Sequence, residues 1–198
     1  MTSASTRERV VDAALLAFGS RGYDATSLDA LAGELGVRKQ TILYYCPSKE
    51  ALLDAAIDQA AAELSEALQQ ALYGAGDNGW DRVEAIVRSV FRLAARRPEL
   101  LGLLREVSRL GPPAATRLTA ALGPLINRAA AFLEVEMDAG AMRRHDPRLL
   151  LLASYSAVIG VATEVEVLRA LGYEPTARSL VRRRRELLSF LRSALVPG

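Results

Sequence analysis

The chain has 198 residues, of which 51% are hydrophobic and only 6% aromatic, and it carries a formal net charge of +2 at pH 7. A chain of this length and composition buries roughly 70% of its unfolded surface, which excludes an intrinsically disordered protein. The net charge does not by itself indicate a nucleic-acid partner, because residues 1–50 balance six basic against six acidic side chains.

The apolar stretches are too short to predict a membrane protein. The longest stretch without a charged residue, 149–163, has fifteen residues, fewer than the roughly 20 that cross a bilayer. Asp12 interrupts the first apolar stretch after a polar start, so we expect no signal peptide. The single cysteine, Cys46, has no internal disulfide partner. We therefore expect a cytoplasmic protein with no membrane contact.

The N-terminal segment predicts a helix from about residue 6 to 19, because its apolar residues recur on one helical face. Ser5 and Glu8 have the spacing of a capping box at its start. Gly19 and Gly22 are expected to end it, since glycine readily adopts the left-handed conformation that ends helices.

Two short helices and one longer helix are predicted next. Thr26 and Asp29 repeat the capping-box spacing ahead of a short helix. The expected buried face of this helix consists of Leu28, Leu31, Ala32 and Leu35. Gly36 predicts a turn, residues 38–45 predict a third short helix, and a fourth helix begins at 47–50 and extends to about residue 73.

The remainder of the chain predicts only helices. Residues 74–79 are rich in glycine and other turn formers and indicate a linker. Proline and glycine breaks then separate five candidate helices, at 80–96, 98–110, 114–138, 147–171 and 176–195. Gly123 and Pro124 either kink or split the third of these. Since no strand pattern or internal repeat is visible, we predict an all-α fold.

Residues 28–47 have the features of a helix-turn-helix motif, which needs a small residue where its helices cross and a glycine in the turn. Ala32 occupies the crossing position, and Gly36 follows four residues later. The apolar contacts that would fix the second helix are supplied by Leu31, Leu35, Val37 and Ile42. The alternative is a helical hairpin with no role in DNA binding.

The N-terminal part of the chain resembles the TetR family of transcriptional regulators over residues 6–53. The residues that carry the resemblance are Gly22-Tyr23, Thr26-Ser27, Gly36-Val37, Thr41, Tyr45 and Pro47-Ser48-Lys49-Glu50-Ala51-Leu52-Leu53. It implies a three-helix DNA-binding domain at 1–50 and a helical effector-binding and dimerisation domain at 51–198. It further implies a homodimer on a palindromic operator in double-stranded DNA, acting as a ligand-released repressor and not as an enzyme, with activation of transcription through the same contacts as the alternative.

The resemblance assigns DNA contacts to nine residues: Ser27, Asp29, Arg38, Lys39, Gln40, Thr41, Tyr44, Tyr45 and Lys49. Lys39 and Gln40 fall where bases are read, and their side chains suit guanine and adenine respectively. Asp29 is also base-facing and could accept from cytosine, although complementing the helix dipole is the alternative. The hydroxyl groups and Lys49 fall where the phosphate backbone is held.

Three positions depart from the usual pattern of the family. Arg38 replaces a small polar residue, Leu43 stands where tyrosine is frequent, and Cys46 stands where phenylalanine is frequent. Cys46 is expected to be a small buried hydrophobe, with redox sensing as the alternative. These departures, together with the balanced charge of residues 1–50, motivate a second hypothesis. It is a helical small-molecule sensor or protein-interaction module that has lost specific operator binding.

The resemblance places the dimer interface on the last two long helices. The sequence offers a stripe of Leu180, Leu187, Leu188, Leu191 and Leu195, and a close-approach face of Ala157, Gly160 and Val161. The alternative is that the leucine stripe packs inside one subunit. We expect residues 182–185, four consecutive arginines, to form a solvated face, and His145 to lie on the surface before a helix capped by Asp146.

A pocket between helices would take a small hydrophobic or amphipathic effector. Its candidate lining is Phe91, Leu104, Phe132 and Tyr155, with Ser108 and Asn127 as polar contacts, and the alternative for each is ordinary core packing. No metal site or cofactor is expected, because the one histidine and the one cysteine lie far apart and no phosphate loop is present.

Overall fold

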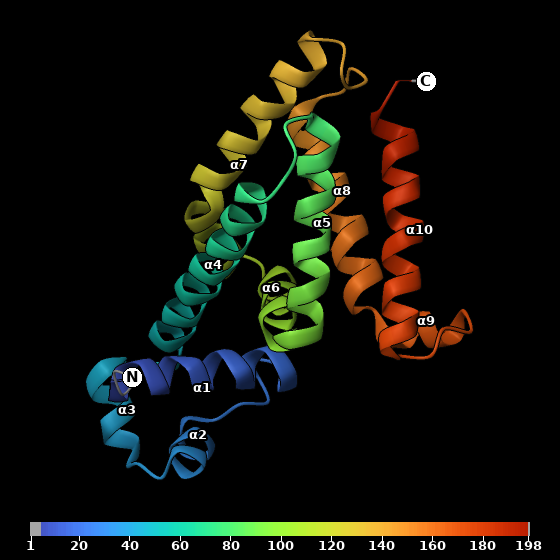
Figure 1. Cartoon of the computed structure of the whole chain (residues 1–198). Coiled ribbons are helices and arrows are strands. Elements are labelled where there is room, and N and C mark those ends of the chain that lie inside the picture. The colour runs from blue at the N-terminus through green and yellow to red at the C-terminus, as the bar shows by residue number, and fades with distance from the viewer. Residues whose placement is uncertain (1–4, 198) are drawn as a thin grey trace. The chain divides into compact units, whose positions relative to one another are not determined.

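The computed structural model describes residues 5–197, and every element of regular secondary structure in that range is an α-helix (Figure 1). The helices are α1 (Thr6–Arg21), α2 (Leu28–Leu35), α3 (Lys39–Tyr45), α4 (Lys49–Tyr73), α5 (Gly79–Arg96), α6 (Pro98–Leu110), α7 (Ala114–Asp138), α8 (Pro147–Thr163), α9 (Val165–Ala170) and α10 (Ala177–Leu195). The predicted all-α fold is confirmed. No helix between residues 5 and 197 is long and apolar enough to cross a membrane.

The chain folds into two compact units. The first contains the described residues up to 64 together with 97–122, and so includes α1 to α3 and α6 with the adjoining parts of α4 and α7. The second contains 65–96 and the described residues from 123 onward, and so includes α5 and α8 to α10 with the other parts of α4 and α7. The sequence analysis divides the chain by role after residue 50, whereas these two units are defined by compact packing. The division by role stays a prediction.

The start of α1 agrees with the sequence analysis, but its end does not. The Ser5 N–H donates to Glu8 Oε2 at 2.8 Å and the Glu8 N–H donates to Ser5 Oγ at 3.2 Å, which forms the predicted capping box. Gly19 lies inside the helix, which ends two residues later, before Gly22 with φ +90°. The absence of a Cβ at Gly19 allows close packing against the Glu99 backbone in α6.

The predicted capping box at Thr26 and Asp29 is wrong. Ser27 caps α2 instead, since its Oγ accepts from the Ala30 N–H at 3.1 Å. Thr26 is buried and its hydroxyl donates to the Gly22 carbonyl at 2.9 Å, which closes the turn after α1. The hydroxyl of Thr26 therefore stabilises the turn rather than the helix.

The helix predicted at 114–138 has its predicted extent, whereas the helix predicted at 147–171 does not. α7 runs without interruption through Pro124, so Gly123-Pro124 does not split it. The helix predicted at 147–171 is two helices, because α8 ends at Thr163 and α9 begins at Val165. Asp146 caps α8 as expected, with Oδ1 accepting from the N–H groups of Arg148 and Leu149, and His145 is exposed.

α5, α8 and α10 pack together in the second unit (Figure 1). The stripe on α10 formed by Leu187, Leu188, Leu191 and Leu195 is buried within this single chain, so these residues do not present the interface predicted from the sequence. Arg183 is also buried, and its guanidinium donates to the Val161 carbonyl. The expectation of a solvated face for residues 182–185 is therefore wrong for Arg183.

Candidate nucleic-acid interface

α2 and α3 form a helix-turn-helix in which the second helix is anchored by a buried side chain. Leu31 and Ala32 are buried on α2, and Ile42 is fully buried on α3. Gly36 adopts the left-handed conformation, with φ +66°, and the next N–H, of Val37, donates to the Ala32 carbonyl at 3.0 Å. Because the apolar side of α3 is anchored in this way, its other side faces outward.

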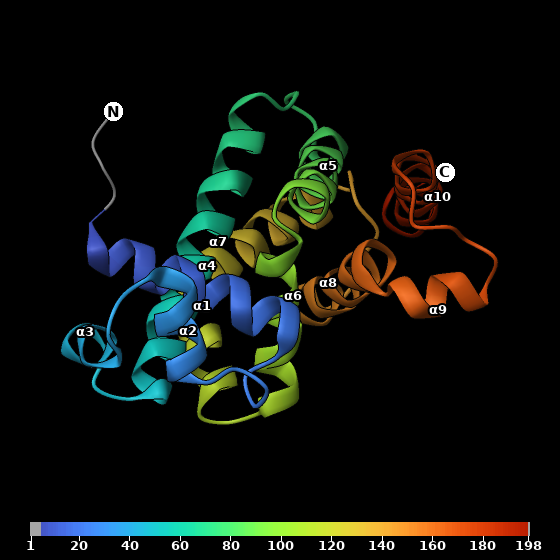
Figure 2. The same ribbon diagram turned by 90° about the horizontal axis from the view of Figure 1, so that it is seen from below.

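The outward side of α3 carries groups that suit the recognition of DNA bases. α3 lies at the outer edge of the first unit (Figure 2). Arg38, at the cap of α3, and Gln40 in its first turn are exposed, and Tyr44 is 82% exposed. Lys39 is half-buried, and its Nζ donates to Asp29 Oδ2 at 2.8 Å, which joins the first turns of α2 and α3. The structure thus brings together the residues expected to face the bases.

The residues expected to hold phosphate surround this face. Thr41 and Tyr45 are half-buried on α3, and the ring of Tyr45 lies edge-on to that of Tyr44 with centroids 5.1 Å apart. The Ser27 hydroxyl accepts a backbone N–H as a helix cap, so its own proton can still be donated. Lys49, in the first turn of α4, has its Nζ 4.2 Å from the ring centroid of Tyr23.

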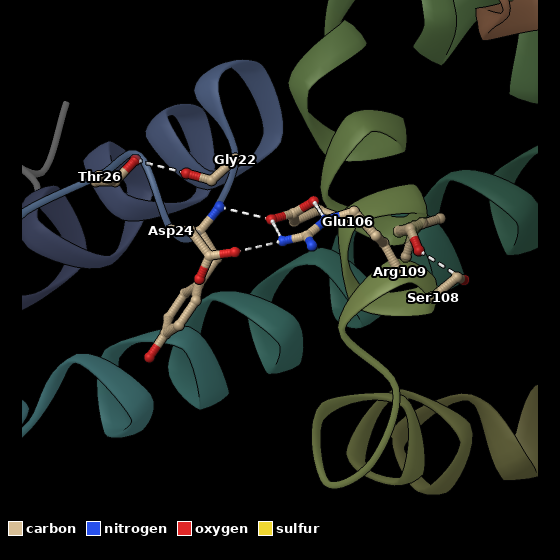
Figure 3. Close-up of polar contacts among 8 residues, drawn as sticks. Gly22, Asp24, Thr26, Glu106, Ser108 and Arg109 are labelled. Atoms are coloured by element: carbon tan, nitrogen blue, oxygen red, sulfur yellow. Dashed lines mark hydrogen bonds and ion pairs between the residues drawn. The ribbon is translucent and has the colours of Figure 1, made fainter.

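A polar latch that the sequence analysis missed joins the turn after α1 to α6 (Figure 3). The backbone N–H of Tyr23 donates to Glu106 Oε1 at 2.7 Å, and Arg109 bridges Glu106 Oε2 at 2.8 Å and Asp24 Oδ2 at 2.9 Å. The hydrogen bond from Arg109 holds the pKa of Glu106 below its usual 4.5, against the opposing effect of burial. The two contacts that join Tyr23 and Asp24 to α6 link residues more than 80 positions apart, so no local pattern could have indicated them.

Tyr23 links this latch to the start of α4. Its hydroxyl donates to Glu50 Oε1 at 3.2 Å, and its ring packs against Phe18 with centroids 5.3 Å apart. Burial, reinforced by the negative charge of Glu50, raises the pKa of the Tyr23 phenol to about 12. The phenol therefore stays protonated at neutral pH and keeps its hydrogen bond to Glu50, next to Lys49.

α1 and α6 cross with their backbones in direct contact. A Cβ added to Gly102 of α6 would lie 3.0 Å from the carbonyl carbon of Gly19 and closer still to its oxygen. The side chains around the crossing are fully buried, among them Leu15, Phe18 and Leu103. α1, α2 and α3 are thus part of the same packed unit as α6.

Cys46 follows α3 and is 3% exposed. Burial raises the pKa of its thiol, and the positive charge of Arg7 only partly offsets this. A thiol in such surroundings is mostly protonated and has little tendency to react. These observations favour the interpretation of Cys46 as a small buried hydrophobe over a redox sensor.

The six residues predicted to bind an effector are divided between the two units. Leu104 and Ser108 belong to the first unit, while Phe91, Asn127, Phe132 and Tyr155 belong to the second. Phe91 and Leu104 are buried core residues, and the Asn127 side chain accepts from Arg148 at 3.0 Å. An open hollow of about 440 Å³ in the first unit is lined by other residues, among them Cys46, Asp58 and Arg117. The effector site stays a prediction.

The comparisons with known proteins agree with this geometry. Residues 10–56 match the family described as bacterial regulatory proteins, tetR family. Over 110 residues the chain is 32% identical to the HTH-type transcriptional repressor DrrR1 of Streptomyces coeruleorubidus, a match that covers 55% of this chain and 39% of that protein. The match therefore spans only about two fifths of that relative.

Solved structures extend the likeness to the whole fold. A putative transcriptional regulator from Saccharomonospora viridis in complex with choline gives a TM-score of 0.78 at 19% identity, covering 97% of this chain and 98% of that one. FadR from Bacillus subtilis in complex with stearoyl-CoA gives a TM-score of 0.77 at 19% identity, covering 94% and 97%. At this level of identity the two structures show the fold alone.

Proposed function

We propose that the chain, whose residues 10–56 match the tetR family of bacterial regulatory proteins, is a ligand-released repressor that binds a palindromic operator as a homodimer. The observation that carries the proposal is the anchored α3, whose outward face combines Lys39 and Gln40 with exposed Arg38 and Tyr44. A helix held at a fixed angle with such a face has the geometry that reads the major groove.

The nine residues predicted to contact DNA divide into two groups under this proposal. Asp29, Lys39 and Gln40 meet base edges and specify sequence, because their donors and acceptors suit major-groove patterns. The hydroxyl groups of Ser27, Thr41, Tyr44 and Tyr45, together with Lys49, hold phosphates and set the register. Arg38 precedes α3 and is exposed, so it can reach either a guanine or a phosphate.

We propose that the dimer forms through the exposed side of α8 rather than through the leucine stripe of α10. Leu149 and Leu152 of α8 are 64% and 59% exposed, and Phe190 of α10 is 61% exposed. The stripe on α8 continues through exposed Ala153 and Ser156 to Gly160, where an added Cβ would meet nothing within 4 Å. Small residues that follow exposed leucines suit close packing against the same helix of a second subunit.

We further propose a hydrophobic or amphipathic effector. The relatives of this fold include one solved with stearoyl-CoA and one solved with choline, which supports a ligand pocket in the helical body of this chain. Phe91, Phe132 and Tyr155 of the second unit remain the candidate contacts, with Asn127 as a polar partner. Effector binding would shift the population of dimers toward a conformation in which the spacing of the two DNA-binding domains no longer fits the operator.

Selection from a random duplex library, followed by a shift assay, tests the proposal. We expect the protein to enrich a palindrome whose half-sites are centred about 34 Å apart, or a related spacing, and to bind it in a salt-sensitive manner. Gln40→Ala should change which bases are selected, while Lys49→Ala should weaken binding to all sequences. Enrichment of no sequence by the folded wild-type dimer would instead favour a sensor or interaction module without operator binding.

A further inference from the structure

One acidic side chain lies among the groups that face DNA. The Asp29 side chain is 72% exposed on the first turn of α2, and its Oδ2 accepts from Lys39 Nζ at 2.8 Å. An exposed ion pair of this kind contributes little to folding stability. A carboxylate on a surface that meets phosphates also weakens association with any duplex. Neither the ion pair nor general affinity for DNA therefore explains Asp29, and complementing the dipole of α2 from its first turn is the alternative role.

We propose that Asp29 and Lys39 together read one guanine–cytosine pair in each half-site, so that Asp29 raises the selectivity of the protein while it lowers its general affinity for DNA. This inference rests on the proposed function. In the major groove, guanine presents its O6 acceptor next to the N4 donor of cytosine. The ammonium of Lys39 and the carboxylate of Asp29 form a donor and an acceptor held side by side, which matches that order.

The same pair rejects an adenine–thymine pair in which adenine takes the place of guanine. The N6 donor of adenine would then face the ammonium of Lys39, and the O4 acceptor of thymine would face the carboxylate of Asp29. One contact places a donor against a donor and the other an acceptor against an acceptor. The mismatch therefore leaves the desolvated ammonium of Lys39 and the carboxylate of Asp29 without hydrogen-bond partners on the bases. On non-cognate DNA, Asp29 also keeps Lys39 neutralised, which lowers the attraction to phosphates.

α2 offers a matched control for this pair. Glu34 accepts from Arg21 at 2.7 Å, and these side chains are 48% and 45% exposed. Glu34 lies five residues after Asp29, about 140° around the helix, and pairs with α1 instead of α3. Both carboxylates thus form exposed ion pairs from one helix, but only Asp29 pairs with the recognition helix.

The test measures base preference and affinity for wild type, Asp29→Asn, Lys39→Ala, the double variant and Glu34→Gln. The probes are the operator selected by the wild type, the same operator with each guanine–cytosine pair replaced in turn by an adenine–thymine pair with adenine in the place of guanine, and a random duplex. For Asp29→Asn we expect about fivefold tighter binding to the random duplex and a roughly tenfold loss of discrimination at one base pair of each half-site. Lys39→Ala should lose the preference at that same base pair, and the double variant should lose no more.

Glu34→Gln should retain the wild-type preferences, and the asparagine variant should keep the helix content, because Asp29 is exposed. If Asp29→Asn selects the same bases with the same discrimination as wild type, the proposed pairing is overturned while the regulator function stands. If it weakens the random and the selected duplexes equally, the selective role is likewise overturned. If the wild type selects no sequence, the proposed function itself is wrong.

Discussion

Replacing Gly19 by alanine tests the backbone contact between α1 and α6. The added Cβ would lie 2.7 Å from the carbonyl carbon of Glu99 and closer still to its oxygen, and neither is a side chain that can rotate away. Because carbon atoms pack at about 3.5 Å or more, the two helices must separate by roughly 1 Å. Such overpacking costs about 3 kcal/mol, and the better helix propensity of alanine returns about 1 kcal/mol. We therefore expect a loss of about 2 kcal/mol.

Urea unfolding followed by circular dichroism measures this loss, at one protein concentration because the stability of the proposed dimer would depend on concentration. Gly33→Ala is the matched control, since Gly33 is also helical but an added Cβ there would meet nothing within 4 Å. We expect Gly33→Ala to stabilise the protein by about 0.5–1 kcal/mol. If Gly19→Ala were as stable as the wild type or more stable, the close crossing of α1 and α6 would be refuted.

Three further predictions concern the latch, the dimer and the thiol. Glu106→Ala should lower the free energy of unfolding by about 2 kcal/mol, because it leaves the Tyr23 N–H without an acceptor. Since the pKa of Glu106 is lowered in the folded state, its contribution is present above pH 4.5 and lost as the pH falls further, so the urea midpoints of variant and wild type should converge in acid. Leu152→Glu should raise the dimer dissociation constant at least about tenfold with unchanged helix content, as measured by sedimentation equilibrium, and an unchanged constant would exclude this face. Cys46 should react with a disulfide reagent at less than about a tenth of the rate measured in urea, and equal rates would contradict its burial.

Local chemistry predicted most of the fold, because the signals that start and stop helices lie within a few residues of each other. Ser5 with Glu8, the turn at Gly36 and the cap at Asp146 all act as the sequence indicates. Gly19 was misread as a helix stop because the residue that requires a glycine there, Glu99, lies in another helix. Thr26 was misread as a cap because two hydroxyl residues are adjacent and only the backbone conformation selects Ser27.

The candidate site could be predicted in part. The residues on α2 and α3 form a contiguous motif, so their common face follows from helix geometry and the turn. The latch from Tyr23 to Glu106 could not be predicted, since its partners are 83 positions apart. The leucine stripe of α10 shows a different limit, because an amphipathic pattern establishes that a face is buried but not whether the partner is the same chain or a second copy.

The central claim is that the outward face of α3 enters the major groove, and chemical protection of guanine N7 on the selected operator tests it directly. We expect protection of guanines in two half-sites about one helical turn apart, or a whole number of turns, on one side of the duplex. The double variant Lys39→Ala with Gln40→Ala should lose this protection at protein concentrations that still occupy the DNA. Full occupancy by the wild type without any protection of guanine N7, or with protection unchanged in the double variant, would contradict the account.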